Sequence, residues 1–168
     1  MTATLHRCWV YGDDVNTDVI FPGKYTYTLT DPAELAAHAL EDLDPAFARE
    51  VRPGDVIVAG RNWGCGSSRE QAVSALKAAG VSVIIAASFS RIYFRNCINQ
   101  GLLPVALPAL RELVNTGDTI QIDRAAGQIA AAGRTFAIPP LSPSVQAILD
   151  AGGLIPMLSA RFAGERAP

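Results

Sequence analysis

The sequence has no long hydrophobic run. Its longest apolar stretches, such as VSVIIAA at 81–87, are far shorter than the roughly 20 residues that a membrane-spanning helix needs. The first residues, MTATLHRCWV, do not have the composition of a secretory signal peptide. We therefore expect a protein that has no membrane part and that works in the cytoplasm.

Cysteine and histidine are scarce. The three cysteines, Cys8, Cys65 and Cys97, form an odd set with no C-x-x-C spacing, and only His6 and His38 accompany them. This set argues against a disulfide framework and against a zinc site. An iron–sulfur cluster usually takes three or four cysteine ligands, which this chain could supply only from three distant positions. We expect this chain to bind no metal, and any cluster to be carried by another chain.

An excess of basic residues is also missing. The 168 residues carry a formal net charge of -2, with 49% hydrophobic and 18% charged residues, as in an ordinary soluble globular protein. We therefore expect no nucleic-acid partner. Because no repeat, low-complexity segment or long linker divides the chain, we expect a single domain over residues 1–168.

The sequence does have alternating strand and helix patterns. It predicts a strand at Val56–Ala59, a helix over 69–80 that ends at Gly80, and a buried strand over 81–87. In such a βαβ unit the loop before the helix lies at the carboxyl end of the first strand, where binding sites gather in open α/β sheets.

The remaining patterns complete an α/β fold with a mixed sheet. A capping box that begins at Asp31 predicts a helix over 31–40. Other expected elements are a strand at 5–12, a long loop at 13–30, helices at 88–101, 109–117 and 142–153, a strand at 102–108, and a hairpin or meander over 118–140. We expect the tail, 160–168, to be loosely held at its end.

The loop GCGSSRE, residues 64–70, contains more than a turn requires. Gly64 and Gly66 allow positive φ and a close approach of backbone to a ligand. A helix N-terminus offers unpaired N–H donors, and Arg69 adds a cation suited to a carboxylate or phosphate. Together with the serine hydroxyls, these groups predict an anion site.

Two capping boxes can be written in the same loop, Ser67 with Glu70 and Ser68 with Gln71, although a helix needs only one. The simplest alternative is therefore a capped helix after a tight turn, with Arg69 in solvent. Neither G-x-G-x-x-G nor G-x-x-x-x-G-K-[ST] is present, so nucleotide binding is not supported.

Cys65 could be a nucleophile activated by the helix N-terminus, but no histidine lies nearby in the sequence to act as its base. A serine hydroxyl could act as a base only if another group removed its proton, and the chain has no evident set of residues for that. The pattern is typical of half an active site.

Four ordered segments resemble one family, the small subunits of 3-isopropylmalate dehydratase, which correspond to the swivelling domain of the aconitase superfamily. The segments are GDDVNTDVIFPGKY at 12–25, with its TD-x-I-x-P pattern, DPAFAREVRPGDVIVAG at 44–60, GCGSSRE at 64–70, and IIAASFSRIYFRNCINQGLLPV at 84–105. The resemblance is strong over about Tyr11–Pro108 and follows the rest in outline. It implies a swivelling β/β/α domain with a mixed sheet flanked by helices.

The resemblance also implies an activity. Such a chain is one subunit of a heterodimeric or heterotetrameric hydro-lyase that moves a hydroxyl between neighbouring carbons of a malate-type acid, as in leucine biosynthesis. A [4Fe-4S] cluster on a separate large subunit acts as Lewis acid, and the small subunit closes over the substrate. By motif, Ser67 would be the base, and Gly66, Ser68 and Arg69 would hold a carboxylate.

Two further segments carry expected site residues. Thr17 and Asp18 match the TD pair, or else stabilise a turn. By the resemblance, the loop made of Lys24, Tyr25, Thr26, Tyr27 and Thr28 reads the variable substituent of the substrate. Homoaconitase-type relatives tend to have an arginine in this loop. Since this chain has none at 26–28, an apolar substituent is favoured.

Gln71 stands where the family usually has histidine in S-S-R-E-H-A, which leaves the exact substrate open. The alternatives are a related hydratase acting on 2,3-dimethylmalate, citraconate or methylmalate, or homoaconitate. A non-catalytic anion-binding module is the alternative from a different class.

Overall fold

One mixed sheet organises the chain. The computed structural model describes residues 4–165, and its seven strands follow the order β4-β3-β2-β1-β5-β6-β7. The strands are β1 (Thr4–Val10), β2 (Val56–Ala59), β3 (Val83–Ala86), β4 (Leu103–Ala106), β5 (Thr119–Asp123), β6 (Gln128–Ala131) and β7 (Arg134–Ala137).

The sheet is parallel in one half and antiparallel in the other. Strands β1 to β4 pair in parallel, with Cys8 opposite Val56 and Val56 opposite Val83. Strand β5 pairs antiparallel with β1, and β5, β6 and β7 form the expected meander. The predicted α/β class with a mixed sheet and the predicted βαβ unit are therefore confirmed.

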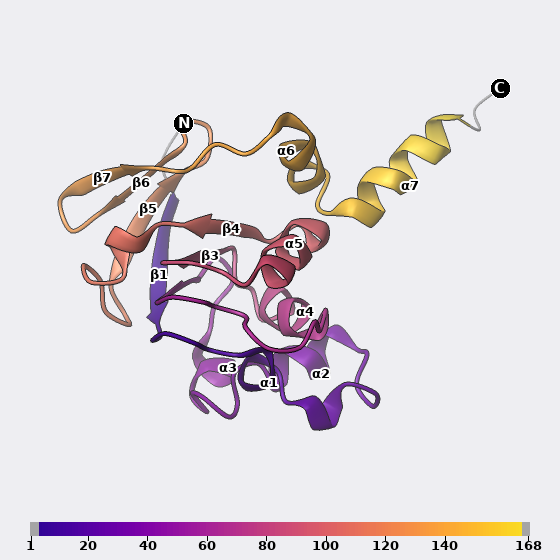
Figure 1. The fold of residues 1–168 in the computed structure, drawn as a ribbon, viewed down its shortest axis with the longest axis horizontal. Helices are drawn as coiled ribbons and strands as arrows, with labels where there is room; N and C mark the ends of the chain where they lie inside the picture. Colours follow the sequence, from indigo (N-terminus) through magenta and orange to yellow (C-terminus); the bar gives the residue numbers. More distant parts are fainter. Residues whose placement is uncertain (1–3, 166–168) are drawn as a thin grey trace.

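Helices flank this sheet (Figure 1). They are α1 (Thr17–Ile20), α2 (Pro32–Ala37), α3 (Phe47–Glu50), α4 (Gln71–Ala78), α5 (Arg91–Gln100), α6 (Pro143–Asp150) and α7 (Leu154–Glu165), together with 3-10 turns η1 (Gly23–Tyr25) and η2 (Pro108–Leu110). The Asp31 side chain accepts from the N–H groups of Ala33 and Glu34, which confirms the predicted start of α2. Gly101 ends α5 at a φ of 75°.

Side chains on the two faces of the parallel strands enter separate cores, as the alternation of Cβ directions requires. One face packs on helices: Trp9, Ile57 and Ile84 meet Leu35, Leu76 and Tyr93. The other face packs on the curled meander: Val56, Val58 and Ile85 meet Ile120, Ile122 and Ile129. The central parallel strands β2 and β3 are thus buried on both faces, and the ends of the strands remain available for a site.

Three element predictions were wrong. The segment expected as a long loop at 13–30 contains α1 and η1, since the Asn16 side chain caps α1 by accepting from the Val19 N–H. The 109–117 segment forms only the short η2 and turns, because backbone and side-chain bonds tie it to β1. The Gly117 N–H donates to the Cys8 carbonyl at 2.9 Å, and the Val10 N–H donates to Thr116 Oγ1 at 2.8 Å. The helix over 142–153 is also not the last, because α7 follows it and projects from the body (Figure 1). The end of the tail, 166–168, lies outside the described residues.

Candidate active site

The glycine loop lies between two other segments at the carboxyl ends of β1 and β3. On one side, the Gly64 N–H donates to the Val15 carbonyl at 2.8 Å, and the Thr17 N–H donates to the Cys65 carbonyl at 2.9 Å. On the other side, Trp63 exchanges backbone hydrogen bonds of 3.0 Å with Ser88 and Ser90. Three segments distant in sequence therefore run side by side, at the sheet edge predicted for the site.

Glycine is required at position 64 by close packing. The residue has a φ of 76°, and a Cβ there would lie 2.1 Å from Cγ of Tyr93. The Tyr93 hydroxyl donates to the Ala72 carbonyl at 2.9 Å, so the ring joins the loop to α4 from a buried position. Gly66 has a φ of 92°, which turns the chain toward the serines.

The two predicted capping boxes do not form. Helix α4 begins only at Gln71, after Glu70, and no side chain caps it. The hydrogen bonds to Val15 and Thr17 hold residues 64 and 65 in a bridge with the 15–17 segment, so the helical turn starts later than the serine pattern suggests. Both serine hydroxyls are therefore free of a capping role.

The Ser67 hydroxyl lies between two polar side chains. Arg69 Nε donates to Ser67 Oγ at 3.1 Å, and Thr17 Oγ1 lies 3.3 Å from the same oxygen. Thr17, which is buried, donates to the Ser67 carbonyl at 2.8 Å. A cationic donor on a hydroxyl oxygen stabilises negative charge there, so this arrangement favours ionisation of Ser67.

Arg69 is fixed by its surroundings. Its Nη2 forms an ion pair with Asp18, and its guanidinium packs so close to Gly23 that a Cβ there would lie 2.7 Å from Nη1. Nη1 is buried and has no hydrogen-bond partner within the described residues. Its side chain is only 18% exposed, whereas that of Asp18 is 61% exposed. The Asp18 carboxylate that pairs with Arg69 is therefore open to solvent, and another anion could take its place on Arg69.

The backbone beside these side chains also offers donors. Within residues 4–165, the N–H groups of Ser67, Ser68 and Arg69 donate to no protein acceptor. They precede α4, whose N-terminus adds its own partial positive charge. Successive free N–H groups of this kind favour the binding of an anion.

These groups open onto one pocket of about 660 Å³, which we call the glycine-loop pocket. Its lining contains the predicted residues Thr26, Tyr27, Ser67, Ser68 and Arg69, and also Gly23, Glu70, Gln71 and Asn96. Gly66 and Thr17 line the narrow space directly behind it. Asn96, on α5, was missed because the resemblance contained it only as part of a long stretch, with no motif to single it out.

Three residues of the predicted loop do not line this pocket. Lys24 and Tyr25 are bonded instead to Glu41, at 3.1 Å from Lys24 Nζ and 3.2 Å from the Tyr25 hydroxyl. Thr28 donates to the Tyr25 carbonyl. The structure thus separates the loop into Thr26 and Tyr27 at the pocket and its other residues outside.

The cysteines lie apart. Cys8 and Cys97 are buried in different cores, and burial raises the pKa of Cys8 to about 12 and that of Cys97 well above its ordinary value. The histidines have other partners than Cys65, since His6 bonds the Gly54 carbonyl and His38 bonds Glu41. Between residues 4 and 165, no three His, Cys, Asp or Glu side chains are grouped so as to hold a metal ion.

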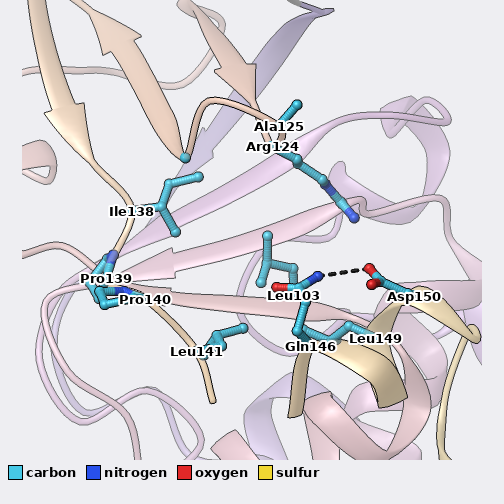
Figure 2. Close-up of a pocket in the computed structure, with 11 residues that line it drawn as sticks. Leu103, Arg124, Ala125, Ile138, Pro139, Pro140, Leu141, Gln146, Leu149 and Asp150 are labelled. Atoms are coloured by element: carbon cyan, nitrogen blue, oxygen red, sulfur yellow. Dashed lines mark hydrogen bonds between the residues drawn. The ribbon is translucent and has the colours of Figure 1, made fainter. Parts of the chain in front are cut away.

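A second pocket, of about 330 Å³, lies between the meander, the start of β4 and α6 (Figure 2). Arg124 and Asp150 lie at one side of it, and Leu103, Ile138 and Leu141 line the rest. None of its lining residues was predicted for the site.

In the part of the chain that the structure describes, no helix is long and apolar enough to cross a membrane.

Comparison with known proteins identifies the family. Residues 16–110 match the model of the aconitase C-terminal domain. The 3-isopropylmalate dehydratase small subunit of Moorella thermoacetica is 46% identical over 155 residues, which cover 91% of this chain and 93% of that one. The chain belongs to this family of dehydratase small subunits. Members of this family are subunits of hydro-lyases, and the chain shares that class.

Two further relatives bear on fold and substrate. A crystal structure of 3-isopropylmalate dehydratase from Methanocaldococcus jannaschii matches with a TM-score of 0.88 and 42% identity, over 96% of each chain. It confirms the predicted swivel-domain fold class. The methanogen homoaconitase small subunit of Methanothermobacter thermautotrophicus is 50% identical over 151 residues, covering 89% of this chain and 86% of that one. The family therefore includes members with different named substrates.

Proposed function

We propose that this chain is the small subunit of a 3-isopropylmalate dehydratase, which interconverts 2-isopropylmalate and 3-isopropylmalate by dehydration and rehydration. The observation that carries the proposal is the Ser67 hydroxyl, held at 3.1 Å from Arg69 Nε at the glycine-loop pocket. The pathway would be leucine biosynthesis, which the relatives' name implies, and the cytoplasmic location expected from composition fits such a role.

In this proposal Ser67 is the base. As an alkoxide, its Oγ takes the proton from the carbon next to a substrate carboxylate, the C–H electrons form the double bond, and hydroxide leaves from the neighbouring carbon. Arg69 Nε donates to Oγ and would stabilise its charge, while the Thr17 hydroxyl donates to the Ser67 carbonyl and would hold the residue in place. In the rehydration step hydroxide adds to the carbon that lost its proton, and Ser67 Oγ gives the proton to the carbon that lost hydroxide, which yields the other isomer.

Arg69, Ser68 and Gly66 would hold the substrate carboxylate, together with the free N–H groups of residues 67–69. In this structure Asp18 is paired with Arg69. We infer that the exposed Asp18 carboxylate moves aside when the substrate carboxylate binds. The exchange replaces one charge-assisted pair with another, and it keeps Arg69 paired in both states.

The residues of this chain do not fit an iron–sulfur cluster, because its cysteines lie in two separate cores and a loop. We therefore assign the [4Fe-4S] cluster that the family implies to a partner large subunit. The open glycine-loop pocket would be completed when that subunit covers it, in a heterodimer or heterotetramer. The relatives from Moorella and Thermodesulfovibrio are likewise named small subunits.

Homoaconitase is the second candidate activity, because the Methanothermobacter relative of that name is 50% identical. Its substrate carries an extra carboxylate, which needs a cation. The cation that the 23–28 loop contains, Lys24, is paired with Glu41 outside the glycine-loop pocket. We therefore favour an apolar substituent, as in isopropylmalate or dimethylmalate.

The test is to co-express the chain with an iron–sulfur large subunit under anaerobic conditions and to follow formation of the unsaturated acid from isopropylmalate, 2,3-dimethylmalate and homocitrate. Loss of a positioned base costs about 10²–10⁴-fold, so Ser67→Ala should lower kcat by that factor. Ser144→Ala, on exposed α6, is the matched control and should leave kcat unchanged. Full activity of Ser67→Ala would instead favour the anion-binding module.

A further inference from the structure

The 23–28 loop contacts the glycine-loop pocket through only two of its side chains, Thr26 and Tyr27. The Tyr27 side chain is 96% exposed and can make few contacts of its own with the protein. The position of Tyr27 must therefore be set by its neighbours in the chain, whereas Thr26 is partly buried. The contacts of those neighbours lead to a residue outside all the family motifs.

Glu41 receives three bonds from around the loop. Its Oε1 lies 3.1 Å from Lys24 Nζ and 3.2 Å from the Tyr25 hydroxyl, and its Oε2 lies 2.5 Å from His38 Nδ1. Lys24 and Tyr25 belong to η1, whereas His38 ends α2. One carboxylate therefore joins the start of the loop to the segment that follows α2. We call these four residues the Glu41 cluster.

Ring contacts reinforce the Glu41 cluster. The centroids of the Tyr25 and His38 rings are 4.0 Å apart, and Lys24 Nζ lies 4.9 Å from the centroid of the Tyr25 ring. The centroids of the Phe21 and Tyr25 rings are 6.1 Å apart. Tyr25 is thus held by a carboxylate at its hydroxyl and by rings and a cation around it.

Charge keeps the cluster together. Burial raises the pKa of Glu41, but hydrogen bonds from His38, Lys24 and Tyr25 together lower it by more. The net pKa is therefore below its usual value. The hydrogen bond to Glu41 also raises the pKa of Lys24. The carboxylate is therefore ionised at neutral pH and attracts the Lys24 ammonium.

A second attachment holds the loop from the pocket side. Gln71 Nε2 donates to the Thr26 carbonyl at 3.4 Å, from the first position of α4. Gln71 thus connects the loop to the same helix start that follows Ser67 and Arg69. The loop is fixed at Lys24 and Tyr25 by Glu41 and at Thr26 by Gln71.

We propose that Glu41 is a positioning residue that fixes the 23–28 loop against the Ser67–Arg69 loop, so that Thr26 and Tyr27 shape the place of the substrate's variable substituent. Its role rests on the proposed function, because it acts through a loop that reads the substrate. The side-chain partners of Glu41 are Lys24, Tyr25 and His38, none of which lines the glycine-loop pocket. Glu41 therefore determines specificity without contacting substrate.

The kinetic test uses Glu41→Ala and Glu41→Gln in the complex with the large subunit. Misplacing a substrate-contacting group by about 1 Å can cost about 10²-fold. We expect Glu41→Ala to raise KM for isopropylmalate about tenfold, to lower kcat less, and to reduce the preference for isopropylmalate over homocitrate about tenfold. Glu41→Gln, which keeps the shape but not the charge, should fall between Glu41→Ala and the parent chain. Glu34→Ala, an exposed glutamate on α2, is the control and should change neither parameter.

A second measurement does not depend on activity. The N–H groups of Tyr25, Thr26, Thr28 and Leu29 donate within the loop, so amide hydrogen exchange of the full chain reports whether the loop stays closed. Glu41→Ala should speed exchange at these amides at least tenfold, with exchange in β2 and β3 unchanged as evidence that the variant is folded. Glu34→Ala should leave all of them unchanged.

The outcomes separate the two claims. Unchanged exchange at residues 25–29 in Glu41→Ala overturns the positioning role, as does faster exchange with unaltered KM and substrate preference. A parent complex that turns over none of the malate-type acids refutes the proposed function, and the exchange result then still decides whether Glu41 holds the loop.

Discussion

Arg69 illustrates how one residue can be both positioned and available. Asp18, Gly23 and Ser67 fix its guanidinium, yet the Asp18 carboxylate on it is exposed and exchangeable. Arg69 is thus paired with Asp18 while its Nε donates to the Ser67 hydroxyl oxygen. A substrate carboxylate would replace Asp18 without any change in the Arg69 side chain, which is the kind of pre-organised site that catalysis needs.

Another single residue, Asp55, gives a test of the stability of the fold. Its carboxylate is buried and accepts from Arg7 at 2.6 Å, Trp9 at 2.8 Å and the Arg52 N–H at 3.0 Å. Burial raises the pKa of Asp55, but these hydrogen bonds together lower it by more. The net pKa therefore lies below its ordinary value. A lowered pKa stabilises the fold fully above the unfolded value of about 4 and loses that effect as the pH falls through the folded value.

We therefore predict that Asp55→Asn lowers the free energy of unfolding by about 2 kcal/mol at pH 7 and flattens its fall below about pH 4. Urea unfolding at pH 7 and pH 3 measures both effects. Asp42→Asn, at an exposed position, should follow the parent chain. If the free energy of unfolding fell by the same amount between pH 7 and pH 3 in Asp55→Asn and in the parent chain, Asp55 would not be the source of this pH dependence.

Residue chemistry predicted the glycine loop but not how its hydroxyls are used. Gly64, Gly66 and Arg69 in one short loop predicted an anion site, and the free N–H groups of residues 67–69 are consistent with that prediction. The capping boxes failed because the S-x-x-E/Q pattern is local, whereas Ser67 is bonded to Thr17, 50 positions away in sequence. Contacts between distant segments of this kind cannot be read from one local motif.

At the scale of elements, strong periodic patterns were predicted correctly. The βαβ unit of β2, α4 and β3 and the meander formed where the sequence indicated. The expected helix at 109–117 did not form, because its bonds to β1 are tertiary and outweigh helix propensity. Helix α7 was missed because Gly152 and Gly153 read as the end of the chain's last helix.

The 23–28 loop offers a prediction about specificity. Tyr27 lies at the glycine-loop pocket and is almost fully exposed, so an arginine there would be free to pair with a carboxylate. We predict that Tyr27→Arg lowers kcat/KM for isopropylmalate and shifts the ratio of rates toward homocitrate about tenfold. Relative rates on purified complexes measure this shift, and Tyr27→Phe is the uncharged control. An unchanged ratio in Tyr27→Arg would remove the loop from substrate selection.

In the whole molecule, the sheet explains why the glycine-loop pocket lies at one edge. The parallel strands bring residues 15–18, 62–70 and 88–96 to one edge, where they supply hydroxyls, N–H groups and a cation. The same edge leaves the pocket open on its outer side. That this is half of an active site stays a prediction from the few cysteines and histidines, and the family membership supports a large-subunit partner.

The most direct measurement titrates this chain into a purified iron–sulfur large subunit and follows isopropylmalate dehydration under anaerobic conditions. The account predicts no turnover by either protein alone, and a rate that rises with added chain and levels off at one copy per large subunit. It also predicts no such rise with Ser67→Ala. Turnover by this chain alone, or full turnover by the large subunit without it, would contradict the account.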